Sequence, residues 1–528
     1  MWNFKTEKIM KRNTLLFLTG ICFLTSCSLD FDPAGKYSDV TEGVSNELVF
    51  KDKADVTTHL QTMYTGLREC EHFYQDVLLF SEIHSDNAYS GNEGGAPPGV
   101  EKNDVNDMMS KPPLQRGWNR RMNNIALANK LISNIDKVPD PQLTDDDKKQ
   151  IKAQALIYRA MLYYDMALLW GRIPVVIIEA GDITAENIGE AYEKYFPKQN
   201  TEEEVYLQIE EDLLAALPDA PVDNSNKMLC SKGLACTLLA KIYADNTPLR
   251  DYDKVISYCD QVRNLGFSLV NDFGDLFGVK LQDPSAAPGP ANFAIDAKRR
   301  NTEEAIFEIQ FSGAGDRGSF NSQIFGLLLN DFTVVTFANW VLPTHELIHL
   351  FESEPGDKRY PESIVYYGGT QLGFKPPRDW GYSTDHYPHM YKFRSVYSSN
   401  IKYRYADILL LKAEALILKP NPDLAGATAI INQVRQRAGL NALLSSATTT
   451  RDAALQALLT ERRKELAFEG HRWNDLTRLE KVEEVMNTFK DSDPYARLTN
   501  RFVRAYYKFP IQNTVLDANS LLTQNEGY

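Results

Sequence analysis

The pattern that most suggests chemistry is the run His345–His349, which reads HELIH. On a helix, two histidines four residues apart lie on one face and can bind zinc, while Glu346 between them can act as a general base. A third ligand is the difficulty, because Glu352 and Glu354 follow too closely for the usual spacings. Thr344 before the run is typical of a helix N-cap. Because the third ligand is lacking, we predict no metal site. A zinc metallopeptidase is kept as an alternative function.

A second distinctive residue is Cys27, which ends the short sequence LTSC. Basic residues near the N-terminus precede the apolar stretch Leu15–Leu24, and small residues follow it, as in an export signal. This stretch is shorter than the about 20 apolar residues that span a bilayer. The pattern is typical of a bacterial lipobox, whose cysteine is acylated and becomes the first residue of the mature chain. We predict a lipoprotein signal peptide at 1–26 and lipidation of Cys27; an ordinary secretory signal is the alternative.

Composition narrows the class of partner. The chain of 528 residues has a net charge of −14 and contains no basic stripe, which argues against nucleic acid. Besides the cysteines of the signal region, Cys70, Cys230, Cys236 and Cys259 remain, without a C-x-x-C pair. The sequence does not choose among their pairings. Because three of the four fall on apolar helix faces, we favour buried free thiols.

The elements that must position any site are mostly helices. Apolar residues that recur every three or four positions predict helices at 147–170, 201–217, 231–244, 252–265, 403–418, 423–438 and 452–469. Their arrangement in pairs, with small residues at crossing points, resembles tetratricopeptide repeats, although no fixed period is kept. We therefore predict a mostly α fold, with helix pairs over about 54–265 and 403–470 that form a platform. Between them, about 266–400 is a long, loop-rich, mixed excursion with short strand-like pieces such as Ile306–Phe311.

Several longer motifs carry a family resemblance. They are CSLDFDP at Cys27, ALIYRAMLYYDMALLWGRIPVV at Ala155–Val176, YRYADILLLKAEAL at Tyr403–Leu416, ERRKELAFEGHRWNDLTRLEK at Glu461–Lys481, and LDANSLLTQNEGY at the C-terminus. Together they resemble the SusD/RagB outer-membrane nutrient-binding lipoproteins. The charged residues of Glu461–Lys481 read as an ion-pair network rather than as catalytic groups.

The resemblance implies one SusD-like domain over 27–528 at the outer face of the outer membrane. Such proteins cap a TonB-dependent transporter of the SusC type, present glycans or sometimes peptides to it, and do no chemistry. The resemblance thus implies a lipid-anchored binding protein that is not an enzyme and needs no cofactor. A helical-repeat scaffold that binds only proteins is a further alternative.

The family places the ligand on two irregular segments, here 81–100 and 271–340. Sugar binding needs aromatic faces for the rings and polar groups for the hydroxyls. Trp118, Trp170 and Trp473 are read as core instead. The predicted ligand-binding residues are Tyr89, Asn92, Asp316, Arg317, Phe320, Asn321, Phe332 and Trp340, with Trp380 as an outlying candidate.

Overall fold

The computed structural model describes residues 48–72, 80–90, 112–179, 195–222, 224–282, 293–312, 329–330, 334–335, 341–368, 380–395, 397–496, 498 and 500–528. Residues 49–528 belong to one compact unit. Within the described residues, no helix combines the length and the apolar character that crossing a membrane requires.

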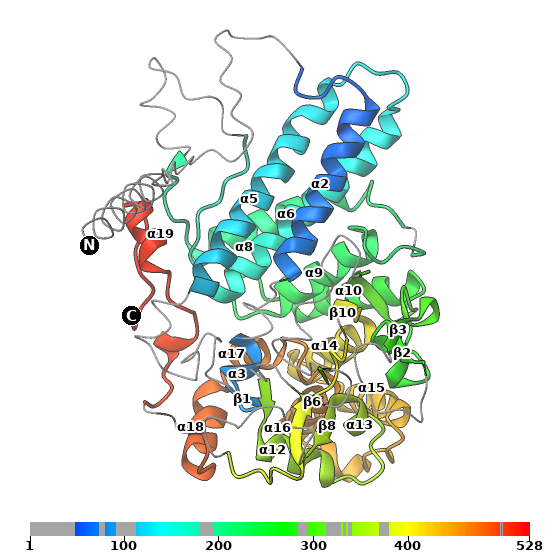
Figure 1. The fold of residues 1–528 in the computed structure, drawn as a ribbon, viewed down its shortest axis with the longest axis vertical. Coiled ribbons are helices and arrows are strands. Elements are labelled where there is room, and N and C mark those ends of the chain that lie inside the picture. Colours follow the sequence, from blue (N-terminus) through cyan, green and yellow to red (C-terminus); the bar gives the residue numbers. More distant parts are fainter. Residues whose placement is uncertain are drawn as a thin grey trace, which may run out of the picture. The chain divides into compact units, whose positions relative to one another are not determined.

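Helices dominate the larger unit, as the sequence predicts (Figure 1). In its N-terminal half, α2, α5 and α6 run alongside one another, α8 packs on α6, and α9 packs on α10. The mostly α expectation is confirmed. These helices are α2 (Lys53–His72), α3 (Phe80–Ile83), α5 (Pro112–Asn134), α6 (Asp145–Trp170), α8 (Glu202–Ala216), α9 (Lys232–Ala244) and α10 (Tyr252–Asn264), and the short 3₁₀ turn η2 (Ile135–Lys137) follows α5.

Local capping explains why these helices begin where they do. The Thr201 hydroxyl accepts the backbone N–H of Glu204, and the Glu204 carboxylate accepts the N–H of Thr201, which completes a capping box. Thr144 and Asp147 form the same box at the start of α6. That helix ends at Gly171, whose φ of 67° suits a residue without a side chain.

The second half adds another set of helices around α14, which packs against α10, α15 and α16. They are α12 (His345–Glu352), α13 (Tyr360–Ser363), α14 (Tyr405–Leu418), α15 (Leu424–Arg437), α16 (Arg451–Glu465), α17 (Arg472–Arg478), α18 (Val482–Ser492) and α19 (Asn513–Ala518). Short 3₁₀ turns accompany them and the excursion: η3 (Phe273–Leu276), η5 (Ala297–Arg299), η7 (Ser445–Thr448) and η8 (Arg504–Tyr506).

Three predicted helix bounds differ from the structure by two residues or more, and the first is the start of α6, which lies at Asp145 instead of 147. The helix expected from 403 begins at Tyr405, because Tyr403 and Arg404 belong to strand β10. The helix expected to reach 469 ends at Glu465. There the backbone turns through positive φ at Phe468 (64°) and Gly470 (81°), and a distant carboxylate described below accepts the N–H groups that the turn exposes.

The excursion contains short strands, which fits the mixed character predicted for it, and β1 and most of β10, outside 266–400, pair with two of them. Among the described residues the pairs are β1 with β7, β4 with β10, β2 with β3, β5 with β6 and β8 with β9. The strands are β1 (Ala88–Ser90), β2 (Val279–Leu281), β3 (Phe293–Ile295), β4 (Ala305–Ile309), β5 (Leu329–Asn330), β6 (Val334–Val335), β7 (Val341–Pro343), β8 (Ile364–Tyr367), β9 (Tyr387–Met390) and β10 (Asn400–Arg404).

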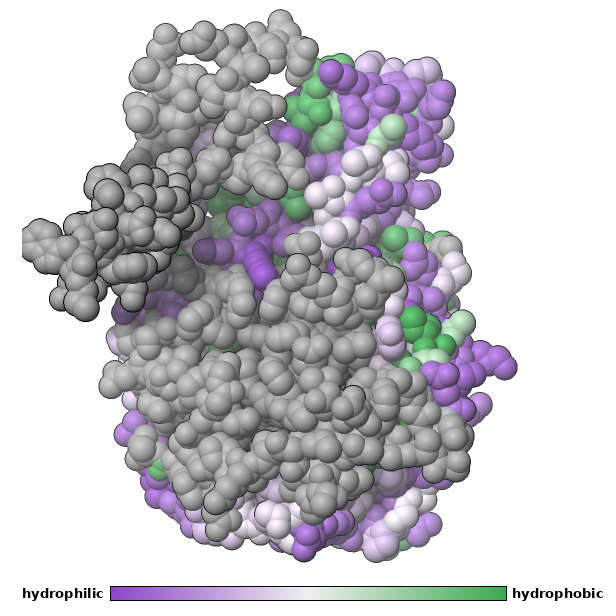
Figure 2. All heavy atoms as spheres, in the orientation of Figure 1, coloured by the Kyte–Doolittle hydropathy of each residue, from purple (hydrophilic) through white to green (hydrophobic). Residues whose placement is uncertain are grey.

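The predicted core residues are buried. Trp118, Trp170 and Trp473 are 6%, 1% and 1% exposed, which confirms that these three tryptophans are core. Cys230, Cys236 and Cys259 are buried free thiols, as expected, and the side chain of Cys70 lies outside the described part. On the face seen in Figure 2, the described surface is mostly hydrophilic, with hydrophobic side chains only in small separate groups.

Charged side chains on α16 tie the excursion to the helices. Glu465 of α16 accepts hydrogen bonds from Arg404 of β10 (2.5 Å), Arg359 (3.1 Å) and Arg437 of α15. All four side chains are nearly or fully buried. The ion-pair network expected in Glu461–Lys481 is therefore present, but it is buried and its partners come from distant segments.

Candidate functional site

The helix with the zinc-like pattern uses its side chains for internal contacts. The Thr344 hydroxyl caps α12 by accepting the N–H of Leu347 at 3.2 Å, as predicted. His345 Nε2 lies 2.8 Å from the Trp380 carbonyl oxygen. A carbonyl can only accept, so Nε2 carries the proton and is not free to ligate a metal.

Glu346, the residue required as a general base, is paired as well. Its Oε1 accepts from Arg463 Nη1 at 2.9 Å. The described residues include no group of three His, Cys, Asp or Glu side chains that could hold a metal ion. The arrangement at His345, Glu346 and His349 therefore does not fit the zinc metallopeptidase alternative.

Two of the predicted ligand residues, Tyr89 and Trp380, lie together. Their rings stack with centroids 4.7 Å apart and an interplanar angle of 18°, and each residue is about 2% exposed. Phe489 lies over Tyr89 at 6.4 Å, and the Tyr89 hydroxyl donates to Asp493 Oδ2 at 2.5 Å. Burial raises the pKa of Tyr89, and the bond to Asp493 adds to the increase. A ligand-contact role for both rings stays a prediction, and their burial counts against it.

Sequence reasoning missed two half-buried tyrosines next to this pair. Tyr382 stacks on His345 (4.0 Å, 23°), and Tyr495 lies 4.9 Å from the same ring. Gly381 is required here, since a Cβ at that position would lie 2.2 Å from the Tyr495 hydroxyl, and its φ is 74°. The Trp-Gly-Tyr sequence at 380–382 could have indicated Tyr382. Tyr495 could not be found in this way, because it lies more than 100 residues further along the chain.

The remaining predicted site residues are not in the described part of the chain. They are Asn92, Asp316, Arg317, Phe320, Asn321, Phe332 and Trp340, together with the lipidation site Cys27. Their roles stay predictions. The structure does describe the strands that flank these residues, after which the chain leaves β1 and before which it enters β7.

These strands form the β1–β7 ladder. Ala88 pairs with Pro343, Tyr89 with Leu342, and Ser90 with Val341. The chain leaves β1 after Ser90 and enters β7 at Val341, so both departures occur at the same end of one ladder. Two segments that are far apart in the sequence are therefore joined at their bases.

Charged groups hold the base of this ladder against α16 and α17. Asp86 receives two hydrogen bonds of 2.8 Å from Arg472, and its backbone oxygen accepts from Arg463 at 2.6 Å. Burial alone would raise the pKa of Asp86, but the two guanidinium groups hold it well below its usual range. Arg463 also donates to Asn87 Oδ1 at 3.0 Å.

Glu82 of α3 makes the second connection. Its carboxylate accepts the backbone N–H groups of Phe468 (3.0 Å) and Gly470 (2.8 Å), which the turn after α16 leaves without helical partners. Asn87 Nδ2 donates to the same carboxylate at 2.9 Å. Phe468, Gly470 and Arg472 of the 461–481 motif therefore help to fix the segment that leads into β1.

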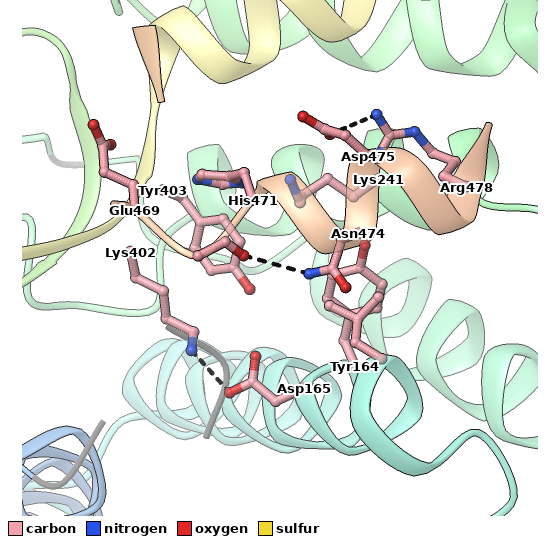
Figure 3. Close-up of a pocket in the computed structure, with 12 residues that line it drawn as sticks. Tyr164, Asp165, Lys241, Lys402, Tyr403, Glu469, His471, Asn474, Asp475 and Arg478 are labelled. Carbon is pink, nitrogen blue, oxygen red and sulfur yellow. Dashed lines mark hydrogen bonds and ion pairs between the residues drawn. The ribbon is translucent and has the colours of Figure 1, made fainter. Parts of the chain in front are cut away.

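His471 sits behind this turn in a small polar cavity (Figure 3). Burial lowers the pKa of His471 to about 4, although the Asp407 carboxylate, 3.9 Å from Nδ1, opposes the shift. The ring is thus neutral near pH 7. The neighbouring ammonium groups are paired, Lys241 with Asp407 at 2.7 Å and Lys402 with Asp165 at 2.8 Å.

The described residues form a mostly helical protein with short antiparallel ladders, and known proteins share this fold. Residues 303–528 match the model of the SusD family, and residues 36–244 match the family described as "Starch-binding associating with outer membrane". The SusD-like protein P2 of Formosa agariphila is 25% identical over 552 residues, covering 98% of this chain and 100% of the relative.

Solved structures agree with these matches. A laminarin-binding SusD-like protein superposes with a TM-score of 0.68 at 20% identity, over 91% of this chain and 100% of its own. Surface glycan-binding protein A of Bacteroides thetaiotaomicron, in complex with laminarihexaose, gives 0.69 at 17% identity, over 90% and 100%. The chain belongs to the SusD/RagB family.

Proposed function

We propose that this protein is a glycan-binding lipoprotein of the cell surface. It captures an oligosaccharide at the outer membrane, facing the cell exterior, and delivers it to a TonB-dependent transporter of the SusC type without cutting it. Membership of the SusD/RagB family supports glycan binding, as do the two glycan-binding proteins that share its fold. The name of the family matched by residues 36–244 supports the outer-membrane location.

The single observation that carries the proposal is that the chain of the first predicted binding segment leaves β1, and that of the second enters β7, at the same end of the β1–β7 ladder. Binding residues on loops are effective when a rigid scaffold holds the loops, because less conformational entropy is then lost on binding. The bidentate contact of Arg472 with Asp86 and the contacts of Glu82 supply that rigidity. A rigid base of this kind suits a protein that captures its ligand with loops.

Glycan binding is tested by calorimetry with a panel of oligosaccharides that includes laminarihexaose. Replacing two loop aromatics at once, Phe320→Ala with Trp340→Ala, should weaken binding at least about tenfold, since each stacked ring contributes about 1–2 kcal/mol. The melting temperature should hardly change. An equal loss of stability would mean that these rings are core, and no binding by any glycan at millimolar concentration would favour the scaffold that binds only proteins.

Lipid anchoring is tested with Cys27→Ala in cells. The variant should leave the membrane fraction for the soluble fraction without loss of folding, because a lipid on the sulfur is the proposed anchor. Cys70→Ala is the matched control and should remain with the membrane. If the Cys27 variant also remains there, the lipid is not the anchor.

A further inference from the structure

A second cavity lies where the end of α6, the start of α8, the loop after α9, α17 and the C-terminal segment meet. It shares no lining residue with the β1–β7 ladder or with the predicted binding segments. Its volume is about 300 Å³. Ligand pockets run from about 300 to 1,000 Å³, so this cavity suits one or two sugar rings rather than a chain of them. We call it the C-terminal cavity.

Its lining combines flat apolar surface with neutral polar groups. Half-buried Tyr507 provides the accessible aromatic face, since Trp170 and Tyr206 behind it are only 1% and 2% exposed, and Asn246 and Asn474 provide amides. Thr247 and Thr477 add hydroxyl groups. Aromatic faces pack against the C–H side of a sugar ring, while amides and hydroxyls donate to and accept from its hydroxyl groups.

The charges around the cavity are balanced. Lys508 pairs with Glu202 at 2.7 Å, and Arg478 pairs with Glu414 at 2.8 Å. Arg504 pairs with Glu480 at 2.5 Å. Asp245 also lines the cavity, where it is buried and accepts from the Tyr206 hydroxyl at 2.9 Å, and the exposed charges Arg172 and Glu526 have opposite signs. A neutral ligand matches this lining better than an anion or a cation.

The inner end of the C-terminal cavity continues into the small cavity of Figure 3, since Leu168, Asn474 and Arg478 line both. The small cavity has a volume of about 30 Å³, which is room for one or two waters. A hydroxyl or hydroxymethyl group of a ligand could replace such a water at modest cost. Asn474 lies at the junction, and its amide has only a weak contact, 3.5 Å from the Gly470 oxygen.

We propose that the C-terminal cavity is a second binding site, which takes a neutral mono- or disaccharide independently of the loop site. Tyr507 and Asn474 are its central contacts, one for the ring face and one for a hydroxyl group. The site does not rest on the function proposed above, because its lining comes from different elements.

The test is saturation-transfer NMR followed by titration of the full chain with D-glucose, D-galactose, D-mannose, D-xylose, cellobiose, maltose and laminaribiose. We expect a dissociation constant on the order of millimolar for at least one of them. Asn474→Leu and Tyr507→Ala should each weaken it at least about tenfold. Asn264→Leu, an amide on the exposed end of α10, is the matched control and should leave it unchanged.

Trp340→Ala separates the two sites, because Trp340 is a predicted residue of the loop site and is not among the described residues that line the C-terminal cavity, so the change should not affect this binding. The proposal is overturned if no sugar binds at about 50 mM. It is also overturned if Trp340→Ala abolishes binding while Asn474→Leu retains it, or if only a charged sugar such as galacturonic acid binds. None of these three outcomes counts against oligosaccharide capture by the loops.

Discussion

The buried carboxylate of Glu465 offers the sharpest test of how the excursion is held. This side chain is fully buried and lies among Arg359, Arg404 and Arg437. Burial alone would raise the pKa of Glu465, but the three guanidinium groups hold it well below its usual range. The carboxylate is therefore ionised at all physiological pH values. We consider the change Glu465→Gln, which keeps the shape and removes the charge.

The expected loss of stability follows from the arginine groups that Glu465→Gln leaves without their carboxylate partner. The glutamine amide would place a donor against arginine donors, and a buried cluster of three guanidinium groups would lose one negative charge. Arg404 would then keep Glu304 (2.7 Å) and Glu469 (2.7 Å), while Arg437 would keep Glu304 alone among the described carboxylates (2.9 Å). Removing one partner of a buried ion pair costs about 3–5 kcal/mol. We expect a fall of that size in the free energy of unfolding.

Guanidinium unfolding of the purified protein measures this quantity. The control is Glu484→Gln, which removes an exposed carboxylate paired with Lys481 and should change stability by less than about 1 kcal/mol. Limited proteolysis should also cut the Glu465 variant faster within 266–400, because Arg359 and Arg404 attach that excursion to α16. A Glu465→Gln protein as stable as the Glu484 variant would refute the reasoning.

Two further predictions concern pH and the aromatic pair. An unfolded histidine has a pKa near 6.5, whereas that of folded His471 is about 4, so the unfolded state binds more protons and stability falls as the pH drops below 6.5. The loss should reach about 2 kcal/mol at pH 5 in denaturant titrations, and His471→Asn should flatten this dependence. Tyr89→Phe removes the bond to Asp493 and should cost about 1–3 kcal/mol of stability while leaving glycan affinity unchanged. A tenfold loss of affinity would show that Tyr89 touches the ligand after all.

Helices and their starts were predictable because their signals are local. The capping box of Thr201 and Glu204 lies within four residues, and the apolar period of 147–170 identifies the buried face of α6. The turn after α16 was not predictable. It depends on Glu82, whose carboxylate accepts N–H groups of Phe468 and Gly470 from the far end of the chain.

The HELIH run shows why residue types alone do not decide a site. Its spacing is compatible with zinc, but Arg463 and the Trp380 carbonyl take the groups that zinc chemistry would use. Neither partner is a sequence neighbour of the run. The stacking of Tyr89 on Trp380 is likewise a contact between distant segments, and it turned two exposed candidates into buried ones.

The sequence by itself therefore determined the helical class, the family resemblance, the helix caps and the tryptophan core, because each depends on neighbouring residues or on motifs read in order. Only the tertiary structure decided that Ser90 and Val341 lie at the same end of one ladder, and which polar groups beside this ladder are paired. The physical reason is that strand register and buried ion pairs are set by contacts between distant residues, whose energies no local pattern contains.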